Sequence, residues 1–153
     1  MADDIKFNQI TLPPGKEAAI RTIFNHFKYV ALGTANSPDN RKGFIMPVEG
    51  DNFLTDCAFN EVDSNINPSY IRPELVELED SAINDNGRVT LSFACEIDTT
   101  NISEAQMVTL NQMVIVDNQT PNDINSEGFY ASVFPDFEKN GNIAIEFTIE
   151  VSL

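Results

Sequence analysis

The chain lacks most of the residues on which common catalytic and metal sites are built. Its 153 residues include no tryptophan, three tyrosines, one histidine and two cysteines. A Ser-His-Asp or Cys-His mechanism would have to use His26, which lies beside the apolar Phe24 and Phe27 and makes a poor mobile base. We therefore expect a structural or surface role for His26. One histidine and two distant cysteines, Cys57 and Cys95, do not supply the usual four ligands of a tetrahedral zinc site.

Basic residues are also scarce, with nine Lys and Arg against 24 Asp and Glu and a net charge of −15. A field of that sign repels phosphate backbones and anionic lipid, so we expect neither a nucleic-acid nor a membrane partner. The acidity either keeps the surface soluble or meets a basic partner. No run approaches the ~18 apolar residues of a membrane span. Residues 1–6 lack the basic and then apolar segments of a secretory signal, so we expect a protein that is not secreted and whose cysteines are reduced. A disulfide between Cys57 and Cys95 remains an alternative.

No motif for a cofactor or an ion is complete. The chain has no GxxxxGK[ST] and no GxGxxG, which would indicate a phosphate cradle. Residues Asp123–Gly128 imitate the first half of a calcium loop, but Phe134 stands where the twelfth-position carboxylate is needed, so we interpret the segment as a turn-rich loop. With little aromatic surface for sugar stacking, we predict no catalytic, cofactor or metal site and no enzyme. The carboxylate pairs on the solvent side of predicted strands carry little specificity for glycosidase chemistry: Glu77 with Glu79, and Glu146 with Glu150.

The length and the 42% apolar share fit one domain with a substantial core. We predict an N-terminal arm over residues 1–15, ending in Leu12-Pro13-Pro14-Gly15, and a single domain over residues 16–153. The apolar positions Ile20, Ile23, Phe24 and Phe27 recur at the spacing of one helix face. This stripe predicts one helix from Lys16 to Phe27.

Period-2 alternation dominates the rest of the chain. Apolar residues alternate with polar ones over Ile143–Val151 and over Arg88–Ile97, whereas Met107–Val116 is an apolar run that we expect to be buried on both faces. The dipeptide Asn86-Gly87 predicts a tight hairpin, and Asp117 to Glu127 a long polar loop. The fold class predicted is mostly β, an antiparallel β-sandwich of about seven or eight strands with one N-terminal α-helix. The other predicted strands are Tyr29–Thr34, Phe44–Val48, Phe53–Phe59, Tyr70–Ile83 with an edge, bulge or break at Pro73, and Phe129–Phe134.

The order of segments from about residue 16 to residue 153 resembles that of small tailed-bacteriophage tail proteins, a family of tail fibre, baseplate or collar-associated β-sandwiches. The segments are an N-terminal helix, Tyr29–Thr34, Val89–Ile97, Asn101–Ala105, Tyr130–Lys139 and Ile143–Val151. This chain departs from the family pattern at Phe147, where tryptophan is usual, at Gln106, where glycine is usual, and at Ser132, where arginine is usual.

The resemblance implies a non-enzymatic virion structural protein, an assembly or adaptor module of the tail, collar or baseplate. It implies other virion structural proteins as partners, a homo-oligomeric ring or fibre, assembly in the host bacterial cytoplasm, and no catalytic residue or cofactor. A head fibre or capsid-decorating subunit is an alternative. A glycan-binding receptor module is another, although the loops Ser37–Lys42 and Asn118–Glu127 contain no aromatic residue. An enzyme acting on cell-wall sugar is the least favoured alternative.

Overall fold

A computed structural model describes residues 10–35, 59–68, 70–80, 82–97, 108–123, 125–139 and 144–153. All the strand pairs within these ranges are antiparallel, and one helix accompanies them, which confirms the mostly-β prediction. In chain order the elements are α1 (Pro13–His26), β1 (Tyr29–Ala35), β2 (Phe59–Glu61), β3 (Leu75–Glu77), β4 (Ile83–Asp85), β5 (Arg88–Ile97), β6 (Val108–Val116), β7 (Gly128–Lys139) and β8 (Ile145–Ser152).

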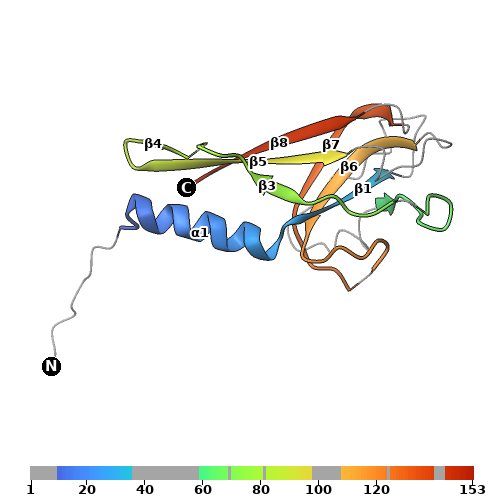
Figure 1. The fold of residues 1–153 in the computed structure, drawn as a ribbon, viewed down its shortest axis with the longest axis horizontal. Helices are drawn as coiled ribbons and strands as arrows, with labels where there is room; N and C mark the ends of the chain where they lie inside the picture. Colours follow the sequence, from blue (N-terminus) through green and yellow to red (C-terminus); the bar gives the residue numbers. More distant parts are fainter. Residues whose placement is uncertain are drawn as a thin grey trace, which may run out of the picture.

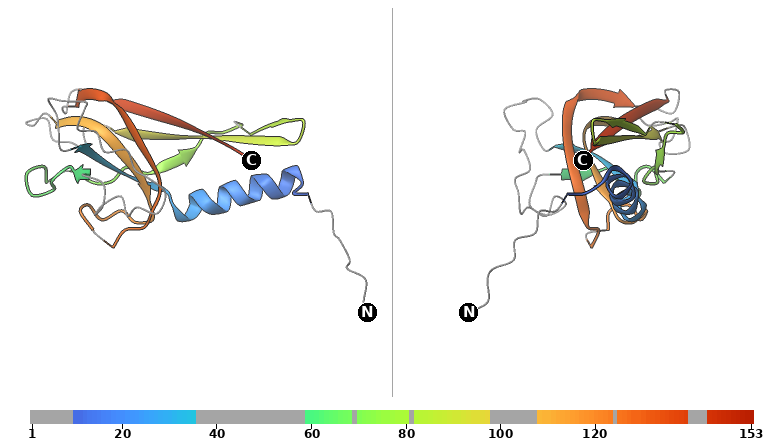
Figure 2. Two further views of the ribbon diagram at one scale, coloured as in Figure 1. Left: turned by 180° about the vertical axis from the view of Figure 1, so that it is seen from behind. Right: turned by 90° about the vertical axis from the view of Figure 1, so that its left-hand side faces the viewer.

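The strands form two sheets. The first sheet has the order β2-β1-β6-β7. In the second sheet, β5 is central, β8 pairs with one side of it, and β4 and β3 follow one another along its other side. Figure 1 shows that α1, β3, β4, the start of β5 and the end of β8 extend away from the first sheet as an elongated arm, and the two views of Figure 2 agree. We call this part of the molecule the arm.

The core runs from the arm into the space between the sheets. Alternate residues of β5 are buried, from Val89 to Ile97, as the period-2 pattern predicts. The helix contributes Ile20 and Phe24, and the ring of Phe24 stacks on that of Phe93 with a centroid distance of 4.6 Å. Each fully buried side chain of this size stabilises the fold by about 1.5–3 kcal/mol. The helix therefore covers the apolar face of β5 along the arm.

The helix begins at Pro13, not at Lys16 as the periodicity predicts, and ends at His26. Pro13 and Pro14 occupy its first two positions, where a missing N–H costs nothing because those groups have no partner within the helix. The predicted stripe is confirmed: Ile20 and Phe24 are buried, and Ile23 and Phe27 pack against the same core. Residues 1–9, which belong to the N-terminal segment 1–15 predicted from the sequence and not to the arm defined above, lie outside the described residues.

The hairpin between β4 and β5 is confirmed. Asn86 and Gly87 have φ values of 52° and 89°, the two positive values that a tight type I′ turn requires, and Gly87 N donates to Asn84 Oδ1 at 3.0 Å. The predicted strand Tyr70–Ile83 is broken into β3 and β4. Pro73 lies just before β3, where its carbonyl accepts a hydrogen bond of 2.9 Å from Val30 N.

The bounds predicted for β7 are wrong, because the strand continues past Phe134 to Lys139. Pairing shifts register between Gln112↔Val133 and Leu110↔Phe137, so a bulge accommodates Pro135, which cannot donate to the ladder. Other strand predictions hold: β6 is buried from Leu110 to Val116, and β8 alternates as predicted, with exposed Glu146 and Glu150. The predicted strand Phe44–Val48, the loop at residues 36–43 and all of Phe53–Phe59 except Phe59 lie outside the described residues.

Candidate functional site

A groove runs along α1, between the helix and the side of the second sheet that carries β3 and β4. Three adjoining hollows form it, and neighbouring hollows share Glu17 and then Arg21 on the helix side. The groove exists because β3 and β4 are only three residues each, so the strand edge does not close over the helix. We call it the α1 groove; its lining includes Pro13, Glu17, Arg21 and Lys28 from the helix side, and Glu74, Glu77, Leu78 and Ile83 from the strand side.

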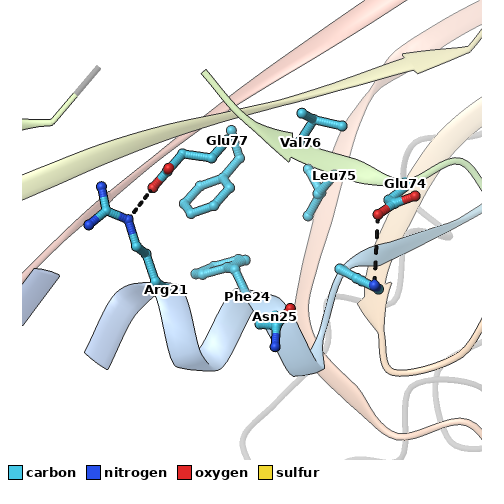
Figure 3. A pocket seen from close by; sticks show the side chains of 9 residues that line it. Arg21, Phe24, Asn25, Glu74, Leu75, Val76 and Glu77 are labelled. Carbon is cyan, nitrogen blue, oxygen red and sulfur yellow. Dashed lines mark hydrogen bonds and ion pairs between the residues drawn. The ribbon is translucent and has the colours of Figure 1, made fainter. Parts of the chain in front are cut away.

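Charged pairs bridge the groove at its inner end (Figure 3). Arg21 Nε donates to Glu77 Oε1 at 2.8 Å, and Lys28 Nζ lies 3.8 Å from Glu74 Oε1. The hydrogen bond to Glu77, followed by that to Glu17, raises the pKa of Arg21 above its ordinary value. These pairs are largely exposed, so they orient side chains across the groove more than they stabilise the fold.

Large apolar side chains are exposed on the arm beside this groove. Leu78 lines it, and Leu12 precedes the helix at its outer end. Val76 pairs with Ala94 and Ile83 with Thr90, which lie on the face of β5 turned away from α1, so these two side chains are exposed on the outer face of β3 and β4. Figure 3 shows Val76 on the side of β3 away from the helix. The described part of the chain exposes four more large apolar side chains elsewhere. Exposed apolar side chains that gather on one part of a surface are typical of protein contact surfaces. The exposed large apolar residues of the arm and its approaches are Ile10, Leu12, Val76, Leu78, Ile83 and Leu153; those elsewhere are Ile66, Ile71, Phe129 and Tyr130.

A second polar feature is buried. The side chain of Arg72 is 0% exposed and forms a two-pronged ion pair with Glu61, from Nε to Oε2 and from Nη2 to Oε1, both at 2.8 Å. Its Nη1 donates to Asn118 Oδ1 at 2.7 Å and to Ser126 Oγ at 2.8 Å. We call this set the Arg72 network. It ties β2 to the loop between β6 and β7.

The carboxylate of Glu61 receives two further hydrogen bonds, from the Tyr70 hydroxyl at 2.6 Å and from Asn122 N at 2.8 Å. Burial would lower the pKa of Arg72, but the hydrogen bonds and charge of Glu61 outweigh it and raise that pKa. Burial is the main cause that raises the pKa of Tyr70 well above its ordinary value, and the negative charge of Glu61 raises it further. Because both oxygens of Glu61 are satisfied inside the protein, we assign the network a structural role.

The residues weighed in the sequence do not converge on one site. His26 is exposed at the end of α1, with its ring edge-on to Phe27 at 4.6 Å. Cys95 is a buried free thiol whose pKa burial raises to about 12, which makes it a poor nucleophile. Glu79 is exposed and lies outside the ion pair that Glu77 forms with Arg21. Cys57 and the loop at residues 37–42 lie outside the described residues.

The imitation calcium loop forms turns. Asp123 Oδ1 accepts from Asn125 N at 2.9 Å, and Asp123 Oδ2 accepts from Asn118 Nδ2 at 3.2 Å. The carboxylate that a calcium loop would direct at its ion is thus engaged within the loop itself. The pair Glu146 and Glu150 is exposed on the outer face of the second sheet.

Local sequence patterns find neither the α1 groove nor the Arg72 network. The one signal of the network in the sequence is Arg72 itself, one of only nine basic residues and placed between Ile71 and Pro73. In the described ranges, no helix is long and apolar enough to cross a membrane. Comparison of the chain with protein-family models, curated proteins and solved structures finds no match.

Proposed function

We propose that the protein is a structural subunit of a tailed-bacteriophage virion, an assembly or adaptor module of the tail, collar or baseplate. The observation that carries this proposal is the set of large apolar side chains exposed on the arm, with Leu78 at the α1 groove and Val76 and Ile83 on the outer face of β3 and β4. The order of sequence segments that resembles small phage tail proteins supplies the virion context. Its partners in this role are other virion structural proteins, with further copies of the same chain in a ring or fibre.

The apolar surface suits a subunit that carries a net charge of −15. Identical copies with this charge repel one another, and apolar contact is the term that offsets the repulsion when they assemble. Val76, Leu78 and Ile83 are 58%, 38% and 59% exposed, so covering the remaining area against a neighbour would contribute about 0.6–1.8 kcal/mol for each side chain. The ion pairs from Arg21 and Lys28 would stay at the edge of such a contact, where interfaces are usually polar.

Stiffness supports the same role. The Arg72 network holds the loop between β6 and β7 by buried, charge-assisted hydrogen bonds. Phe24 and Phe93 fix the helix to β5 by ring stacking. An adaptor needs this kind of fixed geometry, because each contact positions the next subunit.

The test locates the chain on particles. Purified particles of a phage that encodes it would be analysed by mass spectrometry and by immunogold electron microscopy with an antibody against the chain. We expect gold at the tail or neck. Gold over the capsid would instead support the head-fibre or decorating-subunit alternative, and absence of the chain from intact particles would contradict a virion role.

A pair of matched variants tests the surface. Ile83 on the arm and Ile66 in the turn after β2 are each 59% exposed, so replacing either by serine removes a similar apolar area. In complementation of a phage that lacks the gene, we expect Ile83→Ser to lower incorporation into particles. Ile66→Ser should leave incorporation unchanged. Equal incorporation of both variants would exclude this surface of the arm as the contact surface.

A further inference from the structure

Three side chains with metal-binding groups meet at the base of the arm. His26 lies at the end of α1, Asp117 directly follows β6, and Glu127 directly precedes β7. Each offers one ligand atom, and these atoms all lie within 4.8 Å of one another. The cluster is separate from the α1 groove, because the hollows that form the groove do not include any of the three residues.

The backbone fixes the Asp117 carboxylate and holds the main chain of Glu127 beside it. Asp117 N donates to the Glu127 carbonyl at 3.2 Å, and Glu127 N donates to Asp117 Oδ1 at 2.9 Å. These bonds close the neck of the loop between β6 and β7. Arg72 anchors the interior of that loop through Asn118 and Ser126. The Asp117 carboxylate and the backbone of Glu127 are therefore fixed relative to each other, while the exposed side chain of Glu127 can turn toward an ion.

The histidine is brought to the carboxylates by aromatic packing. Phe27, next to His26, stacks on Phe129 with ring centroids 5.3 Å apart, and Phe129 lies near the start of β7. The His26 ring meets the Phe27 ring edge-on at 4.6 Å. The C-terminal end of a helix also carries partial negative charge, which favours a cation there.

From this geometry we propose that His26, Asp117 and Glu127 form a binding site for a divalent transition-metal ion of the Zn²⁺ type. Two close carboxylates repel each other unless a positive charge lies between them. An imidazole nitrogen together with carboxylate oxygens suits zinc and similar ions, whereas calcium and magnesium favour oxygen alone. With three protein ligands, water would complete the coordination shell.

The distances require only a small adjustment. Metal–ligand bonds of about 2.0–2.1 Å in a tetrahedral site place ligand atoms about 3.3–3.5 Å apart. The observed spread of up to 4.8 Å closes by rotation of His26 and Glu127, which are both exposed and can turn without disturbing the core. A bound ion would join the end of α1 to both ends of the loop between β6 and β7, and so fix the arm to the first sheet.

Zinc binding to the full chain, purified without a histidine tag and stripped of metal, tests the site. Because His26 is the only histidine, the nitrogen-15 resonances of its imidazole report coordination without ambiguity. We expect one zinc ion per chain by calorimetry, a shift of those resonances, and a melting temperature raised by about 5 °C or more at zinc a hundredfold above the dissociation constant. Magnesium should leave the imidazole resonances unmoved.

Variants separate this site from general binding to an acidic surface. His26→Gln removes the nitrogen ligand, and Asp117→Asn removes a charge but keeps an oxygen that accepts from Glu127 N. Each should weaken zinc binding at least about tenfold. Glu150→Gln, an exposed carboxylate on the outer face of the second sheet, is the matched control and should bind as the parent does. Unchanged binding by His26→Gln, or no binding at all by the parent chain, would overturn the proposal.

Discussion

Replacing Arg72 by methionine should destabilise the protein more than almost any other single change. The guanidinium is fully buried and pairs with a carboxylate that is itself 3% exposed. Methionine fills much of the same space but cannot donate. Glu61 would keep only the hydrogen bonds from Tyr70 and Asn122, and its charge would stay buried without a cation.

The expected loss is about 3–5 kcal/mol, because removing one partner of a buried pair leaves the other charge uncompensated. The four bonds of 2.7–2.8 Å made by Arg72 would suggest a larger gross effect, but removing a buried guanidinium also relieves its own desolvation cost. For a chain of this length the loss corresponds to a fall of about 6–20 °C in melting temperature. It is a large fraction of the total stability of about 5–15 kcal/mol that is typical of such domains.

A double-mutant cycle separates the pair from its surroundings. Glu61→Leu should also cost about 3–5 kcal/mol, since it leaves Arg72 buried and unpaired. The double variant should recover much of that loss, because an apolar pair of similar volume no longer carries a buried charge. Arg21→Met is the matched control. Arg21 pairs with Glu77 in an exposed position, so its replacement should change stability little.

Urea unfolding followed by far-UV circular dichroism gives the free energies. Hydrogen exchange supplies a local readout, because the amide of Asn122 donates directly to Glu61 and should lose protection in Glu61→Leu, which removes the acceptor. Losses below about 1 kcal/mol in the single variants would refute the assignment of the Arg72 network as a buried stabilising pair. Additive effects in the double variant would refute it equally, because they would show that Arg72 and Glu61 are not coupled.

Two further predictions concern the second sheet. Phe147→Asp should cost at least about 3 kcal/mol, because the partly buried ring packs against the core and lies 5.5 Å from the ring of Phe134. Glu146→Ala, on the exposed face, should have little effect in the same chemical denaturation, and equal losses would contradict this orientation. Burial raises the pKa of the Cys95 thiol from 9.0 to about 12. As pH rises through this window, the unfolded chain loses the thiol proton while the folded chain keeps it. The free energy of unfolding therefore falls by up to about 1.4 kcal/mol per pH unit between these two values. Urea unfolding in that window should show a weaker pH dependence for Cys95→Ala, and an unchanged dependence would mean that Cys95 does not titrate as proposed.

The elements that sequence predicts well are those whose pattern is local. Alternation in Arg88–Ile97 gives the buried face of β5 directly, because successive side chains of a strand point to opposite sides. The apolar run near Met113 predicts a strand buried on both faces, because its apolar side chains point to both sides of the strand. The helix start is misplaced because Pro13 and Pro14 resemble a loop, although both fit the first turn of a helix.

The candidate sites could not be predicted, because their members are far apart in the chain. Arg72 is 11 residues from Glu61 but 46 from Asn118 and 54 from Ser126, and only the folded sheets bring them together. No periodicity encodes which polar side chains meet across two loops. The same holds for His26, which lies between Asn25 and Phe27 in the sequence while its carboxylate neighbours in space come from either end of the loop between β6 and β7.

The proposal of assembly through the arm rests on its unprotected strand edge. Native sheets usually protect an edge with charge, a bulge or a covering element. Here the edge formed by β3 and β4 faces α1 without closing on it, and Val76 and Ile83 are exposed on the face of these strands turned away from α1. At this edge Glu74 is paired with Lys28 and Glu77 with Arg21 across the groove. A neighbouring subunit could therefore cover the apolar side chains without leaving Glu74 or Glu77 buried and unpaired, a step that makes many acidic surfaces poor sites for assembly.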